Sequence, residues 1–317
     1  MFHLNQKPGK GVKKKDVVNA FGFRRFFTSF GEKFWRIVVL NLLFFLTNCP
    51  IFGLFAYLAG VGGVPYRTPV SVLYQPLSGV MLHGKNPALE ALSGVVGVQI
   101  KQGYPSLWTK VLLGVGFLTL FTFGVSTAAM TYIHRNFIRR EPVDLAEDYF
   151  LCIKRNFKQA LLLGLLDLLI LFLIAFDLVS YFYSNQNFAF LLLLYLTAFL
   201  SVLYFLMRPY LYLMCVTFDL KIVKMLKNAC ILAVTAIGRN LLWSFLALLV
   251  PALNVAVFAM VPSLGVGMLF IFTVSIAWFF QVYGAWPVVK KHMIDPFYEE
   301  SDAVPEGGEE AVFEDRG

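Results

Sequence analysis

Charged residues are scarce in this chain. Only 15% of its 317 residues are Asp, Glu, Lys or Arg, whereas 58% are hydrophobic, and the mean hydropathy is +0.70. A soluble domain of this size has too little interior to bury so much apolar surface, whereas a lipid bilayer accepts that surface directly. The composition therefore argues against an ordinary soluble globular protein and predicts an integral membrane protein.

Cysteine and histidine are also rare, with four residues of each. No two cysteines form a CxxC pair, which favours free thiols, and the histidines show no metal-ligand spacing. The sequence also lacks a phosphate-binding loop, an HExxH motif and a paired-carboxylate motif. We therefore expect no metal, no cofactor and no enzymatic activity.

Six stretches are each apolar enough to cross a bilayer, and each reaches the ~20 residues that a ~30 Å hydrocarbon core requires. Polar or proline- and glycine-containing turns at 184–187 and 261–265 separate the third stretch from the fourth and the fifth from the sixth. The predicted spans lie at about 35–58, 111–133, 159–183, 188–207, 240–260 and 266–289. We expect an all-α, polytopic membrane helix bundle.

Lysine and arginine alternate from side to side along these spans. They gather before the first span, between the second and third, between the fourth and fifth, and after the sixth. The turns at 184–187 and 262–265 have none, and the long loop 61–107 has only three. This distribution predicts a cell-membrane protein with both termini in the cytoplasm. The net charge of +8 is accordingly interpreted as membrane anchoring, without a nucleic-acid partner.

Each pair of spans is preceded by a segment with the pattern of an amphipathic interfacial helix. Asp16, Asp144 and Asp219 are the expected caps, and Asp144 and Glu147 have capping-box spacing. The apolar stripes are Phe23, Phe26, Phe27, Phe30 and Phe34, then Tyr149, Ile153 and Phe157, then Val223, Leu226, Cys230, Val234 and Ile237. Two explanations of this similarity stay open. The three units are a threefold hairpin repeat related by an axis along the membrane normal, or they are alike only because every membrane hairpin needs a basic anchor.

The predicted organisation has three parts. Residues 1–33 form a cytoplasmic basic lead with an amphipathic helix, 34–289 form the six-span membrane domain, and 290–317 form an acidic tail expected to be disordered. The outer loop 61–107 carries several prolines, and a short helix is predicted at 86–100. This loop is either a lid or docking surface, or a segment that lies passively on the bilayer.

Asp167 is the first candidate for a functional site. It lies nine positions beyond Lys158, which places it ~13 Å into the membrane, near the midplane. An Asp there costs ~2.5–3.5 kcal/mol on insertion scales, so we expect it to face the bundle interior with a partner or to be protonated. Arg208 either marks the inner end of the fourth span or lies deeper if that helix extends to Phe218, and an ion pair between Asp167 and Arg208 is conceivable.

Polar residues on the other spans fall at a similar depth and predict a polar belt in the bundle. They are Ser126 and Thr127 on the second span, Ser201 on the fourth and Gln281 on the sixth, with Asn41 slightly nearer the cytoplasm. The functional interpretation is a substrate or proton site formed by Asp167, Asn41, Ser126, Thr127 and Gln281. The alternative is a set of interhelical hydrogen bonds that stabilises the bundle.

The segment 124–127, Gly-Val-Ser-Thr, comes near the Gly-x-Ser-Gly motif of intramembrane serine proteases. Thr127 replaces the second glycine, and no histidine within another span is predicted to serve as the base. We therefore interpret Ser126 as a small packing residue.

Three stretches carry a resemblance to a known family. They are Leu40–Leu43 through Pro50, Gly124–Met130 with Arg139–Glu141, Phe150 and Asn156–Ala160, and Phe218–Leu220 with Leu226–Ala229. Together they resemble YesL-like proteins, which are bacterial multi-pass membrane proteins of unassigned activity. Two departures are Val125 in place of a proline and the insertion-like loop 61–107. The resemblance implies an association with carbohydrate uptake and brings no site residues.

The leading functional hypothesis is an accessory component of carbohydrate uptake or sensing, which contacts sugar-transporter subunits or a membrane sensor within the lipid bilayer. A small solute transporter that uses Asp167 in the inner polar belt is the first alternative. A structural membrane scaffold is the second.

Overall fold

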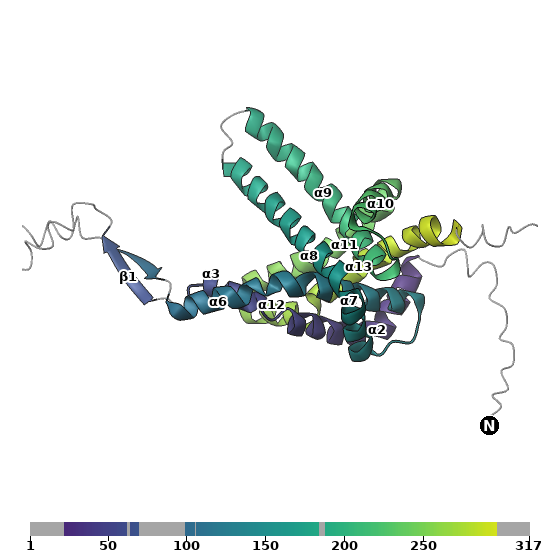
Figure 1. The fold of residues 1–317 in the computed structure, drawn as a ribbon, viewed down its shortest axis with the longest axis horizontal. Helices are drawn as coiled ribbons and strands as arrows, with labels where there is room; N and C mark the ends of the chain where they lie inside the picture. The colour runs from purple at the N-terminus through teal and green to yellow at the C-terminus, as the bar shows by residue number, and fades with distance from the viewer. Residues whose placement is uncertain (1–21, 62–63, 70–98, 105, 184–187, 297–317) are drawn as a thin grey trace, which may run out of the picture. The chain divides into compact units, whose positions relative to one another are not determined.

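The computed structural model describes residues 22–61, 64–69, 99–104, 106–183 and 188–296. The long helices are α2 (Phe23–Thr47), α7 (Thr119–Arg139), α8 (Leu145–Tyr183), α9 (Phe188–Thr217), α11 (Ile237–Met260) and α13 (Val274–Val289). The shorter elements are α3 (Ile51–Leu58), α6 (Leu107–Phe117), α10 (Ile222–Thr235), α12 (Pro262–Met268), the π-helical turns η1 (Leu269–Thr273) and η2 (Lys290–Ile294), and the strands β1 (Val64–Pro69) and β2 (Gln99–Tyr104). The predicted helix bundle is confirmed (Figure 1).

The chain divides into two compact units. Unit 1 contains Met1–Leu46 and Phe123–Gly317, and unit 2 contains Thr47–Thr122. In unit 2, α3 packs closely on α6. A Cβ at Gly53 would lie only 2.7 Å from the carbonyl oxygen of Leu112, which shows how near the two helices are. The strands β1 and β2, which the pattern did not predict, pair antiparallel with Val64 opposite Tyr104. Of the helix predicted at 86–100, only residues 99 and 100 are described, and they lie in β2.

Five helical segments of the described chain are long and apolar enough to cross a membrane, and α2 with α3 counts as a sixth if taken as one broken span. The break falls inside the first predicted span, at 48–50, where the carbonyl oxygen of Asn48 accepts a hydrogen bond from the Ile51 amide at 3.0 Å. Pro50 explains the break, because proline disfavours a helical conformation in the residue before it.

Two of the three predicted interfacial helices are continuous with the following span. The segment from Leu145 runs through Asp167 as the single helix α8, and its start is capped as predicted: the Glu147 amide donates to Asp144 Oδ1 at 3.1 Å. Asp148, not Glu147, makes the return bond, accepting from the Asp144 amide at 2.9 Å. The first predicted stripe lies at the start of α2, and its expected cap, Asp16, lies outside the described residues.

The third interfacial segment is a separate helix, α10, but Asp219 does not cap it. The N-cap is Lys221, which makes no side-chain cap bond. Asp219 lies two residues before this N-cap, in a link whose residues are not helical. In that link, the carbonyl oxygen of Leu220 accepts a hydrogen bond from Gln159 Nε2 of α8 at 2.6 Å. The predicted stripe of α10 faces outward at Val223, while Met225 lies on the buried face.

The core of unit 1 has an aromatic cluster at its centre. The ring of Phe26 lies 4.5 Å from that of Phe280, 5.0 Å from Trp243 and 5.1 Å from Tyr283. Burying rings of this size supplies large apolar areas, and the tilted and edge-on contacts suit the charge distribution of the rings. The cluster joins α2, α11 and α13, whereas Phe27 of the predicted stripe is exposed.

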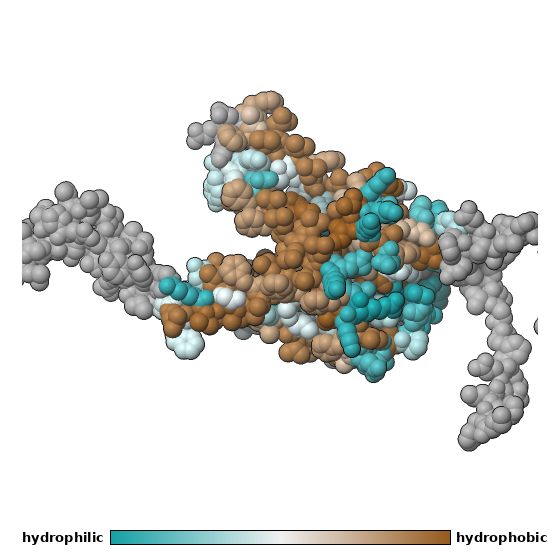
Figure 2. All heavy atoms as spheres, viewed as in Figure 1, coloured by the Kyte–Doolittle hydropathy of each residue, from teal (hydrophilic) through white to brown (hydrophobic). Residues whose placement is uncertain are grey.

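The helices α8 and α9 lie side by side in unit 1 (Figure 1). Among the five unbroken spans, their most apolar windows bury the smallest shares, 17% and 11%, against 39% for Leu107–Arg139. Hydrophobic residues cover most of these two helices, apart from a paler patch near the far end of α8, while hydrophilic residues gather at the end of the bundle where α10 lies (Figure 2). The outer surface of this pair of helices is therefore suited to lipid or to another apolar surface.

Candidate functional site

Asp167 lies in the interior of unit 1, as its depth in the sequence predicts. Its side chain is 1% exposed, and its carboxylate accepts hydrogen bonds from two tyrosine hydroxyls of α9. Tyr204 donates to Oδ1 and Tyr212 donates to Oδ2, each at 2.8 Å. A buried carboxylate needs such partners, because an isolated charge in a low-dielectric interior is strongly unfavourable.

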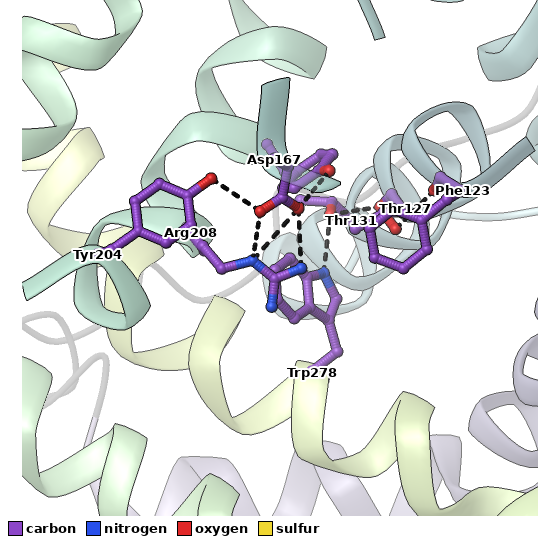
Figure 3. A network of polar contacts seen from close by, with 8 residues as sticks. Phe123, Thr127, Thr131, Asp167, Tyr204, Arg208 and Trp278 are labelled. Atoms are coloured by element: carbon purple, nitrogen blue, oxygen red, sulfur yellow. Dashed lines mark hydrogen bonds and ion pairs between the residues drawn. The ribbon is translucent and has the colours of Figure 1, made fainter. Parts of the chain in front are cut away.

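Arg208 forms an ion pair with Asp167 and approaches it with two nitrogens. Its Nε lies 2.9 Å from Oδ1 and its Nη2 lies 2.8 Å from Oδ2 (Figure 3). This two-point geometry matches the planar guanidinium to the planar carboxylate and is among the strongest polar contacts that proteins make. The pair, which the sequence left as a conceivable contact, is present.

The three donors lie on one face of α9. Tyr204, Arg208 and Tyr212 are each four residues apart, and side chains at this spacing lie above one another along a helix. α9 continues beyond Pro209 to Thr217, so Arg208 is inside the helix and not at its end. We refer to Asp167 and these three donors as the Asp167 centre.

A chain of contacts connects the Asp167 centre to α13 and α7 (Figure 3). The guanidinium carbon of Arg208 lies 5.5 Å from the ring centroid of Trp278, which places a cation over an aromatic face. The indole nitrogen of Trp278 donates to Thr131 Oγ1 at 2.8 Å, and Thr131 donates to the carbonyl oxygen of Thr127 at 2.7 Å. The network therefore spans four helices.

The electrostatic state of the centre follows from its hydrogen bonds. Each carboxylate oxygen accepts one tyrosine hydroxyl and one guanidinium nitrogen, so four close donors meet the roughly four lone-pair sites of a carboxylate. The charges of Asp167 and Arg208 cancel. This arrangement is a satisfied, neutral network, of the kind that fixes the relative position of helices.

Asn41 belongs to a different site from Asp167. Its side-chain nitrogen donates to the carbonyl oxygens of Leu269 and Phe270, at 3.1 and 2.6 Å, and its oxygen accepts from the Ser275 amide at 2.8 Å. The two carbonyl groups belong to the π-helical turn η1, where regular helical hydrogen bonding is interrupted, and the Ser275 amide lies just after it in α13. Asn41 thus binds α2 to the irregular start of α13.

The other predicted residues are buried but do not converge on one cavity. The hydroxyl of Thr127 donates to the carbonyl oxygen of Phe123 in its own helix at 2.8 Å. Ser126 is fully buried on α7, and Gln281 on α13 is 6% exposed. The side-chain oxygen of Gln281 has no hydrogen-bond partner among the described residues. The predicted belt is therefore a set of buried positions, apart from the half-buried Ser201, and Asp167 and Thr127 share one network.

His134 is a buried polar residue that sequence reasoning missed. It is 0% exposed on α7, and its Nε2 lies 3.2 Å from the hydroxyl of Ser275, whose amide contacts Asn41. Its Nδ1 has no partner within the described part of the chain. The lone histidine carried no spacing signal, although its place five residues before Arg139 put it at the inner end of the second span.

Gly124, the first residue of the Gly-Val-Ser-Thr segment, has a packing role. A Cβ on Gly124 would lie 2.4 Å from Gly164 Cα and from the carbonyl oxygen of Ala160. α7 and α8 therefore meet backbone to backbone, as small residues allow in membrane helix pairs. This contact is the local reason that a small residue stands at the start of the segment.

An apolar groove borders the Asp167 centre. It has a volume of about 440 Å³, lies between α8, α9 and α11, and has Tyr204 and Arg208 among its lining residues. No group of three or more His, Cys, Asp and Glu side chains in the described ranges is placed to hold a metal ion. The four cysteines are free thiols.

The fold and the Asp167 centre define a polytopic membrane helix bundle with a buried ion pair. The chain is similar over residues 106–178 to the family described as "Protein of unknown function, DUF624". That stretch begins at the cap of α6 and reaches into α8, and it includes Asp167. No curated protein and no solved structure matches the chain.

Proposed function

We propose that this protein is an accessory membrane component that acts through contact with another protein and performs no catalysis. The observation that carries the proposal is the full occupation of the Asp167 carboxylate by Tyr204, Arg208 and Tyr212. A substrate or a transported proton would need an acceptor position that these donors already use. The centre is therefore suited to hold helices in place, and the outer surface is left for function.

The kind of partner is inferred from the resemblance to YesL-like proteins. That resemblance favours sugar-transporter subunits or a membrane sensor, at the cell membrane and with both termini in the cytoplasm. The surface of α8 and α9 supports this inference, because these spans bury the least of their apolar windows. Exposed aromatic side chains such as Tyr195 and Phe199, each 66% exposed, would supply the contact area.

The test is purification of the tagged full-length chain from its native membranes in mild detergent, with identification of the proteins recovered. We expect subunits of a sugar transporter or a sensor kinase. The double change Tyr195→Ala and Phe199→Ala should lower their recovery. The matched change Leu107→Ala and Trp108→Ala, at exposed residues of unit 2, should not. A protein recovered alone and monodisperse would reject the accessory role.

A small solute transporter is the second candidate, favoured by the apolar groove that borders Tyr204 and Arg208. In this case the ion pair would open during the transport cycle and Asp167 would exchange a proton. Reconstituted vesicles with a trapped pH-sensitive dye test it. Proton flux that depends on the protein and disappears in Asp167→Asn would support transport, whereas flux equal to that of empty vesicles would reject it.

A scaffold without a specific partner is the remaining alternative. It would require only that the bundle folds. Growth that is unchanged by the double change Asp167→Leu with Arg208→Met, which removes both buried charges together, and a protein recovered alone would favour it over both other functions.

A further inference from the structure

Several arginines at the basic end of unit 1 are engaged by the protein itself. Arg135 donates to the carbonyl oxygen of Val216 and to the hydroxyl of Thr217, at 2.9 and 3.0 Å, and so caps the end of α9. Arg239 donates to the carbonyl oxygen of Gly284 at 2.9 Å. Such contacts stabilise helix ends, where backbone carbonyls lack helical partners. These cations have structural roles and are not free for a ligand.

Three cations on the inner part of α8 are different. Lys154, Arg155 and Lys158 are exposed, and no carboxylate of the described residues lies within ion-pair distance of them. All three line one cavity of about 620 Å³, which also includes Asn156, Gln159 and Asp219. Its volume falls in the range of small-molecule sites, roughly 300–1,000 Å³. We call this cavity the α8 basic pocket.

The charge of the α8 basic pocket favours an anion. The residues that line it include three cations and one carboxylate, that of Asp219. The side-chain nitrogens of Asn156 and Gln159 already donate to the carbonyl oxygens of Cys152 and Leu220. The three cations would therefore supply both the charge and the hydrogen bonds to a phosphate group. Like charges held close together without a counter-ion repel one another, and a bound anion would relieve that repulsion.

The position of the pocket indicates where the anion comes from. Phe157, which is 45% exposed, lines the same cavity, and the next turn of α8 presents Leu162, which is 58% exposed. From residue 159 to 166 the helix carries no charge, as expected where it enters hydrocarbon. A phosphate bound at the cations would thus lie beside an apolar surface that fits acyl chains.

We propose that the α8 basic pocket binds the phosphate headgroup of an anionic phospholipid, with the acyl chains along the outer face of α8. Basic pockets between helices at the membrane surface are known to suit such headgroups. The site is separate from the Asp167 centre and does not depend on the proposed accessory function.

The test is a titration of the purified full-length protein in detergent with phosphatidylglycerol, followed by native mass spectrometry of the lipid-bound fraction. We expect saturable binding of phosphatidylglycerol and none above background for phosphatidylcholine. The triple change Lys154→Gln, Arg155→Gln and Lys158→Gln should weaken binding by about tenfold or more. The matched triple change Lys224→Gln, Lys227→Gln and Lys291→Gln removes the same charge from other exposed sites and should leave binding within about twofold.

Three results would overturn the proposal. Equal loss in both triple variants would show a general charge effect and no site. If millimolar inorganic phosphate displaced the lipid and bound with the same affinity as phosphatidylglycerol, the pocket would be assigned to a soluble anion. Equal binding of phosphatidylcholine would exclude charge recognition. If the triple variant is not monodisperse, Lys158→Gln alone should still lose several-fold in affinity while Lys158→Arg retains it, and equal binding by both would count against the site.

Discussion

The two halves of α8 use charge in opposite ways. The N-terminal half carries Lys154, Arg155 and Lys158, which are exposed and have no carboxylate partner among the described residues. The membrane half carries Asp167, which is buried and accepts hydrogen bonds from four donor atoms. One helix thus contains both a satisfied charge and a group of unsatisfied ones.

This contrast distinguishes structural charges from charges that are open to a ligand. A buried charge is tolerated only when its partners are already in place, so the Asp167 centre contributes to the position of helices. Exposed cations around a cavity keep their hydration and can exchange it for a ligand. Burial together with partner count therefore separates the two roles better than charge alone does.

The largest effect should come from breaking the buried pair. In Asp167→Asn the Arg208 charge stays buried without its counter-ion, and we expect the free energy of unfolding to fall by ~3–5 kcal/mol. Unfolding by denaturing detergent measures this loss. Asp177→Asn on the same helix, where the side chain is only partly buried, is the control and should change little. Equal stability of the two variants would contradict the structural role.

A second large effect is expected where α7 meets α8. In Gly124→Ala the new methyl group would lie 2.4 Å from Gly164 Cα, so the two helices must separate. Overpacking of this kind costs ~1–3 kcal/mol. Gly114→Ala has open space around it and serves as the comparison in the same unfolding assay. A neutral Gly124→Ala would mean that this close approach does not occur in the protein.

Smaller effects should follow from removing single donors to Asp167. Tyr204→Phe and Tyr212→Phe each delete one hydroxyl at 2.8 Å and leave the ion pair intact. Membrane hydrogen bonds contribute ~0.6–1.7 kcal/mol each, so both losses should fall in that range. A loss as large as that of Asp167→Asn would show that the hydroxyls, and not Arg208, carry the stabilisation.

The smallest effect on stability is expected at the N-terminal half of α8. Without anionic lipid, replacing Lys154, Arg155 and Lys158 by Gln should change the free energy of unfolding by no more than about 0.5 kcal/mol, because these side chains are exposed and unpaired. The same assay in phosphatidylcholine detergent micelles measures it. A loss of several kcal/mol would place these cations in the same structural class as Arg208.

The sequence predicted a buried position for Asp167, because a carboxylate within an otherwise uncharged span is costly unless it has a partner or is protonated. It did not predict Tyr204 and Tyr212, because tyrosine is an ordinary residue in a chain with 14 of them. Their spacing of four residues on either side of Arg208 was the available signal. Residue spacing places side chains on a face, but it cannot say which neighbouring helix that face meets.

The spans were predicted well and the joints between elements less well. Apolar length alone identifies a span, so the helices long enough to cross a membrane follow from composition. The sequence did not predict that α8 is one continuous helix from Leu145 to Tyr183. The change from an amphipathic to an apolar pattern at the membrane surface is the same whether the helix bends there or continues straight. The role of Asn41 at η1 depends on a backbone irregularity that no local pattern signals.

The most direct test of the account replaces the whole ion pair with apolar side chains. The variant Asp167→Leu with Arg208→Met removes both buried charges at once, so it should recover most of the stability lost in Asp167→Asn. The measurement is the set of proteins recovered with this variant from native membranes. If the Asp167 centre only positions helices, the folded variant recovers the same partners as the unchanged protein. A folded variant that recovers none of them would contradict the account, because the pair would then act in function itself.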